Sequence, residues 1–158
     1  MGSASIKLTA LLQPGQINLS LKSTTRDGVL KELLAMSSLG DKAQQILLVN
    51  LKQREELGST GIGKGIAIPH CRSLMLNSLT LLVGRSKAGV EFDAIDKKPA
   101  RLFFLIIAPP HDPQNQYLIT LGQIAQLAKS ITAADPLFTS DDPQEFIGRI
   151  AELEKNAK

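Results

Sequence analysis

The feature that most constrains the fold is an apolar segment in the second half of the chain. Residues 101–108 read RLFFLIIA and are followed directly by Pro109 and Pro110. A short apolar run that contains β-branched and aromatic residues and ends at turn-forming residues predicts a buried strand. Residues 79–86, LTLLVGRS, have the same character and predict a second buried strand. Other elements of the chain are therefore expected to cover these strands.

Helices are predicted on both sides of this strand region in the sequence. Apolar residues at helical spacing place them over residues 25–38, 41–57 and 114–130 and from Asp142 onward. The first is expected to be capped by Thr24 or Thr25, and the second to be capped by Asp41 and to end at Gly58. The order of the elements predicts an α/β fold, with a mixed β-sheet sandwiched between α-helices in a single domain spanning residues 1–158.

Composition excludes several classes of protein. A length of 158 residues fits one domain, and no apolar run approaches the roughly 20 residues of a membrane helix, so no membrane insertion is expected. The N-terminus lacks the apolar core of a signal peptide, and the single cysteine cannot form an intrachain disulfide, which favours the reducing cytoplasm. With a net charge of +3, one Tyr and no Trp, no nucleic-acid partner is expected.

The segment 58–73, GSTGIGKGIAIPHCRS, has the composition of a phosphate site. It satisfies most of the nucleotide-phosphate motif G-x-x-x-x-G-K-[ST], but Gly65 stands where that motif needs a hydroxyl to bind magnesium. The motif also follows a strand and opens a helix, whereas this segment follows a predicted helix and leads into Pro69. Neither a nucleotide site nor a metal site is therefore predicted.

The alternative is that His70 itself carries a phosphoryl group. A short strand ending in Pro69 delivers this histidine, and the small residues of the loop are expected to leave backbone N–H groups unpaired for an anion. Arg54, Lys64 and Arg72 flank the histidine in sequence and can offset phosphoryl charge. The residues alone leave two alternatives open, a structural histidine and a histidine nucleophile beside an anion site.

The segment from Arg54 to Arg72, REELGSTGIGKGIAIPHCR, closely resembles the phosphorylation-site segment of a known family. That family is the enzyme IIA domains of the bacterial phosphoenolpyruvate-dependent phosphotransferase system, in the fructose/mannitol class and most closely its nitrogen-regulatory branch. Residues 90–109, VEFDAIDKKPARLFFLIIAP, and 117–130, YLITLGQIAQLAKS, are similar to further blocks of the same family. The blocks occur in the family's order across nearly the whole chain.

The resemblance implies a phosphotransferase that acts through a phosphohistidine intermediate. His70 would accept a phosphoryl group from the phosphohistidine of a small histidine phosphocarrier protein. It would pass the group to an enzyme IIB component or hold it as a signal to a regulatory target, and no cofactor is implied. The alternative is a non-catalytic regulatory module whose binding to a partner depends on the phosphorylation state of His70.

The resemblance also assigns roles to individual residues. Arg54 matches the family's active-site arginine, and Ser59 and Thr60 match a Ser-Thr pair that can donate hydrogen bonds to the phosphoryl group. Tyr117 stands where many members have a second histidine, and its hydroxyl either orients the phosphoryl group or its ring packs in the core.

Other polar residues near these segments are expected to have lesser roles. Cys71 replaces a small residue and is interpreted as a tolerated substitution, with redox sensing as the minor alternative. Lys64 and His111 are predicted to be exposed loop residues. Asp93 and Asp96 are predicted to form turns.

Overall fold

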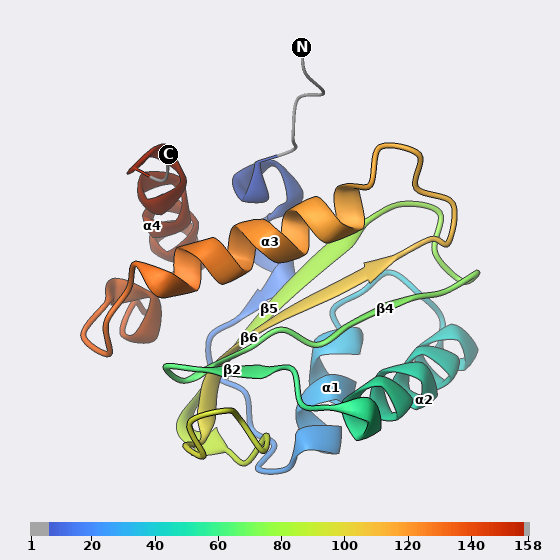
Figure 1. Cartoon of the computed structure of the whole chain (residues 1–158), viewed down its shortest axis with the longest axis horizontal. Coiled ribbons are helices and arrows are strands. Elements are labelled where there is room, and N and C mark those ends of the chain that lie inside the picture. Colours follow the sequence, from blue (N-terminus) through green and yellow to red (C-terminus); the bar gives the residue numbers. More distant parts are fainter. Residues whose placement is uncertain (1–6, 157–158) are drawn as a thin grey trace.

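The computed structural model describes residues 7–156 (Figure 1). The ends of the predicted domain, residues 1–6 and 157–158, lie outside the described residues. The strands are β1 (Ile17–Asn18), β2 (Gly61–Gly63), β3 (Ile66–Ala67), β4 (His70–Arg72), β5 (Thr80–Val90) and β6 (Ala100–Ala108). The α-helices are α1 (Arg26–Leu34), α2 (Asp41–Leu57), α3 (Gln116–Lys129) and α4 (Pro143–Asn156). Short 3-10 helices are η1 (Leu8–Leu11), η2 (Pro14–Gln16) and η3 (Pro136–Phe138).

The strands form one mixed sheet around β6. Its order is β1-β5-β6-β3-β2, and β4 pairs with β6 beyond the end of β3. Strand β5 runs antiparallel to β6, whereas β3 and β4 run parallel to it. The two runs predicted as buried strands are therefore the two long, adjacent strands of the sheet, and the predicted mixed sheet is confirmed.

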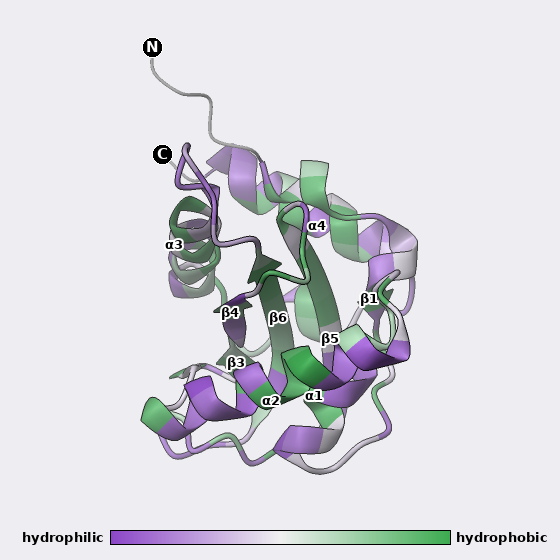
Figure 2. Cartoon of the chain, turned by 90° about the vertical axis from the view of Figure 1, so that its right-hand side faces the viewer, coloured by the Kyte–Doolittle hydropathy of each residue, from purple (hydrophilic) through white to green (hydrophobic). Residues whose placement is uncertain are grey.

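Both faces of β6 are buried from Leu102 to Ala108, which explains why its sequence is apolar over these residues. Leu102, Phe104 and Ile106 belong to the core cluster that includes residues of α3 and α4. Phe103, Leu105 and Ile107 point into the other core cluster, with residues of α1 and α2. Figure 2 shows β5 and β6 as largely green, hydrophobic segments inside the molecule. The prediction of a sheet sandwiched between helices is confirmed.

Helix boundaries follow the predicted ones with two differences. Thr25 is the N-cap of α1, as predicted, and its side chain accepts the Gly28 N–H at 3.1 Å. Asp41 is wrong as the cap of α2: Gly40 takes the extended N-cap backbone, and Asp41 is already the first helical residue. An acidic residue in the first turn still faces the positive end of the helix dipole. Helix α1 ends earlier than expected, at Leu34.

The chain leaves the sheet between β3 and β4, at Pro69. The proline has no N–H to continue the ladder, but its carbonyl accepts the Ile106 N–H at 2.9 Å. Pairing resumes at once, with His70 in register with Ile106. The strand predicted to end at Pro69 is thus shorter than expected, at Ile66–Ala67, and His70 begins a further strand that was not predicted.

Candidate functional site

His70 has one ring nitrogen fixed by the backbone and one left free. Its Nδ1 lies 2.7 Å from the Ile68 carbonyl oxygen, which can only accept a hydrogen bond, so Nδ1 carries the ring proton. Nε2 then keeps an unshared electron pair. Burial of the half-buried ring lowers the pKa of His70, and the positive charge of Arg54 lowers it further. The imidazole is therefore neutral near pH 7, the form in which it is nucleophilic.

Arg54 reaches this site from the last turn of α2, which packs beside β4. Its Nη1 donates to the Gly58 carbonyl at 2.8 Å, so the guanidinium folds back over the end of the helix. The charge of Arg54 acts on the pKa values of both His70 and Tyr117. The structure thus brings Arg54, His70 and Tyr117 into one electrostatic environment.

Ser59 and Thr60 fasten the loop that precedes the histidine. The Thr60 hydroxyl donates to the carboxylate of buried Glu55, and the Thr60 N–H donates to the other oxygen of that carboxylate at 3.0 Å. The Ser59 hydroxyl donates to the Phe92 carbonyl and accepts the Gly61 N–H at 2.9 Å. Both hydroxyl protons already have acceptors in the protein. Phosphoryl binding by either residue stays a prediction, and it requires one of these bonds to be exchanged.

The expectation that the glycine-rich loop leaves its backbone N–H groups unpaired is wrong for much of the loop. The N–H groups of Gly58, Thr60, Gly61 and Lys64 all donate to acceptors in the protein. Glu55 supplies two of these acceptors, one from its backbone and one from its side chain, which the sequence did not suggest. The loop is therefore a fixed support for His70, and the charge of an anion at this histidine would be met chiefly by side chains.

The acidic residues after β5 form turns, as predicted. The Asp96 carboxylate accepts the N–H groups of Lys64 and Lys98, each at 3.1 Å, and Asp93 takes a left-handed backbone with φ of 51°. Lys64 is exposed, as predicted, and its Nζ donates to the Lys129 carbonyl at 3.0 Å at the C-terminal end of α3. A cation is favourable at that end of a helix, so Lys64 has a structural partner of its own.

Tyr117 lies beside the histidine, in the first turn of α3. Its ring centroid is 5.9 Å from that of His70 in an edge-to-face arrangement, and the Arg72 guanidinium carbon lies 4.4 Å from the tyrosine ring centroid. Burial raises the pKa of Tyr117 to about 12, so the phenol is neutral. The ring packs in the core and also contacts both His70 and Arg72, whereas a role for the hydroxyl stays a prediction.

Asp112 organises the same corner, and the sequence reasoning missed it. Its carboxylate accepts the N–H groups of Gln116 and Tyr117, both at 2.9 Å, and lies 3.7 Å from Nη1 of Arg72. The hydrogen bond from the Tyr117 N–H lowers the pKa of Asp112, which keeps the carboxylate ionised. An Asp followed by Pro just before a helix is a typical start signal, and that signal was available in the sequence.

Two further expectations concern residues near the site. His111 is exposed, as predicted. Cys71 is buried, and burial raises the pKa of its thiol to about 12. Because the thiolate is the reactive form, a thiol of this kind is a poor redox sensor. The interpretation of Cys71 as a packing residue is the better supported.

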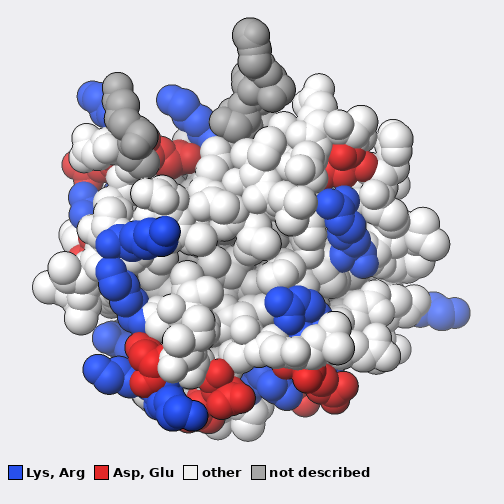
Figure 3. Space-filling model, viewed as in Figure 1, with Lys and Arg blue, Asp and Glu red and all other residues white. Residues whose placement is uncertain are grey.

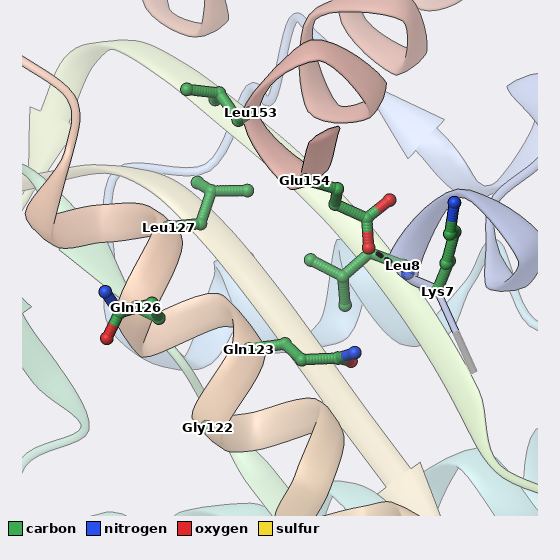
Figure 4. Close-up of a pocket in the computed structure, with 8 residues that line it drawn as sticks. All are labelled: Lys7, Leu8, Gly122, Gln123, Gln126, Leu127, Leu153 and Glu154. Atoms are coloured by element: carbon green, nitrogen blue, oxygen red, sulfur yellow. Dashed lines mark hydrogen bonds between the residues drawn. The ribbon is translucent and has the colours of Figure 1, made fainter. Parts of the chain in front are cut away.

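Two cavities lie away from these residues. One, of about 420 Å³, lies between η1, α3 and α4 and is lined in part by Leu8, Leu127 and Leu153 (Figure 4). The other, of about 530 Å³, adjoins Arg101 and Phe138. Within residues 7–156, no group of three or more His, Cys, Asp or Glu side chains is placed to hold a metal ion. Over the same residues, no helix is both long and apolar enough to cross a membrane.

Comparison with known sequences gives consistent matches. Residues 10–153 match the family model described as "Phosphoenolpyruvate-dependent sugar phosphotransferase system, EIIA 2". A nitrogen regulatory protein of Pseudomonas aeruginosa is 35% identical over 134 residues, which cover 84% of this chain and 86% of that protein. The fructose-specific EIIABC component of Bacillus subtilis is 30% identical over 152 residues, 95% of this chain, but the chain spans only 24% of that protein's length.

Solved structures share the fold. The nitrogen regulatory protein IIA-Ntr of Neisseria meningitidis superimposes with a TM-score of 0.77 at 27% identity, over 90% of this chain and 98% of that one. Mannitol enzyme IIA in its complex with phosphorylated enzyme IIB from Escherichia coli gives a TM-score of 0.70 at 19% identity, over 89% of this chain and 97% of that one. The second likeness concerns the fold alone. Together they confirm the predicted fold class.

Proposed function

The chain belongs to the EIIA 2 family of the phosphoenolpyruvate-dependent sugar phosphotransferase system, and from this membership we propose that it carries a phosphoryl group on Nε2 of His70. We choose Nε2 rather than Nδ1 because Nδ1 of His70 makes a hydrogen bond of 2.7 Å to the Ile68 carbonyl. This bond keeps the ring proton on Nδ1 and leaves the electron pair on Nε2.

In the proposed reaction, Nε2 attacks the phosphorus of a phosphohistidine on a donor protein. The new Nε2–P bond forms as the donor's P–N bond breaks, and the electron pair of that bond returns to the donor imidazole. The proton of His70 stays on Nδ1, which donates it in a hydrogen bond to the Ile68 carbonyl, so the phosphorylated ring is positively charged. Onward transfer then releases His70 as a neutral imidazole. Because the donor already carries the phosphoryl group, the step requires neither a nucleotide nor a metal cofactor.

We propose that Arg54 and Arg72 supply the charge that the phosphoryl oxygens need. Phosphoryl transfer passes through a loose transition state, so catalysis depends mainly on position and electrostatic stabilisation. Arg54 acts on His70 from the end of α2, and Arg72 lies over the Tyr117 ring, which also contacts His70. Tyr117 is neutral and adds no charge, so the two arginines replace the contribution of a second, protonated histidine.

The proposed donor is a small histidine phosphocarrier protein, and the proposed acceptor is an enzyme IIB component or a regulatory target. The solved complex of mannitol enzyme IIA with phosphorylated enzyme IIB supports an acceptor of the IIB class. Similarity to nitrogen regulatory proteins supports the use of the phosphoryl group as a signal. We place the reaction in the cytoplasm, since the one cysteine is unpaired and buried.

Exposed leucines offer an apolar contact for these partners. Leu57, Leu74 and Leu118 are 86%, 85% and 51% exposed. Each is within three residues of Arg54, Arg72 or Tyr117 in the sequence. A protein partner that brings its own histidine to Nε2 has to cover the surface around it, and apolar side chains at that surface favour such contact.

The test is phosphorylation from phosphoenolpyruvate through the general phosphotransferase proteins. We expect one acid-labile phosphoryl group, attached to Nε2 in the ³¹P and ¹⁵N NMR spectra. His70→Ala should abolish it, and His111→Ala, the matched control at the other histidine, should retain it. A label that survives His70→Ala, or that resides on Nδ1, would refute the assignment. Failure of an enzyme IIB component to discharge the labelled protein would instead favour the non-catalytic regulatory module.

A further inference from the structure

The cavity of about 530 Å³ lies near the opposite end of β6 from the phosphorylation site. Arg101 at the start of β6 lines it, whereas His70 is in register with Ile106. The five residue steps from Arg101 to Ile106 along an extended strand correspond to about 16 Å. The charged residues of the wall are Lys64, Lys98, Arg101 and Asp96, and Phe138 and Ile131 contribute apolar surface. This cavity is therefore a separate, predominantly basic site.

Two arginines at this end of the sheet lack the partners that buried cations ordinarily have. Within residues 7–156, Nε of Arg85 and Nε of Arg101 are buried without a hydrogen-bond partner, and neither residue takes part in an ion pair. Arg85 is 2% exposed, and its Nη1 donates to the Leu137 carbonyl at 3.3 Å, next to Phe138 in the cavity wall. Burial lowers the pKa of Arg85; the charge of Asp141 opposes this effect, and that of Arg101 adds to it.

Placing like charges together in a buried region is unfavourable unless something compensates for them. The Arg101 guanidinium carbon lies 5.4 Å from the Phe138 ring centroid, and this contact holds the group at the cavity wall. A guanidinium held in this way presents a planar set of donors that fits the oxygens of a phosphate. An anion in addition to Asp141 and Asp96 would therefore stabilise the arrangement.

The other charged side chains of the wall are partly engaged. The carboxylate oxygens of Asp96 each accept a backbone N–H, from Lys64 and Lys98, and Nζ of Lys64 donates to carbonyls at the end of α3. Arg101 and the Lys98 ammonium remain for a ligand. Figure 3 shows Lys and Arg side chains gathered at the lower left of the molecule, below the end of α3, with a few carboxylates among them.

We propose that this cavity binds a small organic phosphate. Its phosphate would lie against Arg101 and Lys98, with the charge of Arg85 behind them, and its organic part would lie against Phe138 and Ile131. The volume is within the range of about 300–1,000 Å³ for small-molecule sites. The proposal is independent of phosphorylation at His70, since none of the residues that line the cavity belongs to that site.

The test uses inorganic pyrophosphate as the probe and ¹⁵N-labelled full-length protein. We expect saturable shifts of the amides that line the cavity, including Gly65, Ala88 and Ala133, and no comparable shifts with sodium chloride at equal ionic strength. Arg101→Gln should weaken binding by about 10- to 100-fold, the effect of removing hydrogen bonds from a charged donor. Lys87→Gln removes an exposed charge from β5 that does not line the cavity, and it should change the dissociation constant less than about twofold.

Folding and His70 chemistry give independent checks. Because Arg101→Gln relieves repulsion between two arginines, it should melt no lower than wild type and should be phosphorylated at the normal rate. Pyrophosphate should raise the melting temperature of wild type but not of Arg101→Gln. The proposal is overturned by the absence of saturable shifts at millimolar pyrophosphate, by equal weakening in Lys87→Gln, or by marked destabilisation in Arg101→Gln.

Discussion

The contacts of Tyr117 predict that its ring matters for phosphoryl transfer and its hydroxyl does not. The ring meets His70 in an edge-to-face arrangement and Arg72 by its face, and Tyr117→Phe keeps both contacts. Tyr117→Leu removes both and frees the Arg72 guanidinium. A cation–π contact contributes about 0.5–2 kcal/mol. If that energy holds Arg72 in place for the transition state, its loss slows transfer by about 2- to 30-fold.

The assay is the rate of His70 phosphorylation by the phosphorylated donor protein, measured as kcat/KM for each variant. Tyr117→Phe should match wild type, and Tyr117→Leu should show the loss. In an Arg72→Gln background, Tyr117→Leu should cause little further loss, because the arginine that the ring positions is absent. Melting curves check that each variant folds. If Phe is as slow as Leu, the hydroxyl is the active part, and if Leu is as fast as wild type, the ring only packs in the core.

Three further predictions follow from the same site. Arg54→Ala should keep the melting temperature of the wild type, because the hydrogen bond from Arg54 to Gly58 lies on the surface. It should slow phosphorylation by about 10²–10³-fold. A normal transfer rate would show that Arg54 is only a surface charge. Because the pKa of His70 is lowered, the transfer rate should stay constant as pH falls to about 6.5 and should decline only below that pH. The free energy of unfolding should also decrease below about pH 6.5, because the imidazole of the unfolded chain takes up a proton before that of the folded protein. A rate that halves above about pH 6.5 contradicts this prediction. Thr60→Ala leaves the buried Glu55 carboxylate without one donor and should lower the free energy of unfolding by about 1–3 kcal/mol in urea titrations; unchanged stability would show that Glu55 finds another partner.

The elements that the sequence predicted well are those whose own residues are apolar enough to indicate burial. The run from Leu102 to Ala108 is apolar at every position, so its identity as a buried strand follows from composition alone. Strand β4 is different: its three residues, His70 to Arg72, have no pattern, and they are a strand because β6 offers them a partner. The same holds for the two residues of β1, which pair with β5.

The structure brings Arg54, His70 and Tyr117 into one electrostatic environment, as the resemblance implied, while their roles in phosphoryl transfer stay predictions. The sequence could not show that the Glu55 carboxylate accepts a hydrogen bond from the Thr60 hydroxyl, because this bond depends on how the chain turns after α2. Nor does any local pattern mark Arg85 as a buried cation, since its burial comes from the packing of distant segments against β5.

The break at Pro69 has a consequence for how other proteins can approach His70. Among the described strands, β4 pairs only with β6, so its other side is an edge of the sheet. Open edges invite a second chain to add a strand, which leads to aggregation or to recognition through the backbone. Here the edge is three residues long, begins just after a proline and ends in a charged arginine, all features that discourage strand addition. A partner that approaches His70 would therefore be recognised through side chains, and the proposed phosphoryl acceptor can lie at a sheet edge without making the protein prone to self-association.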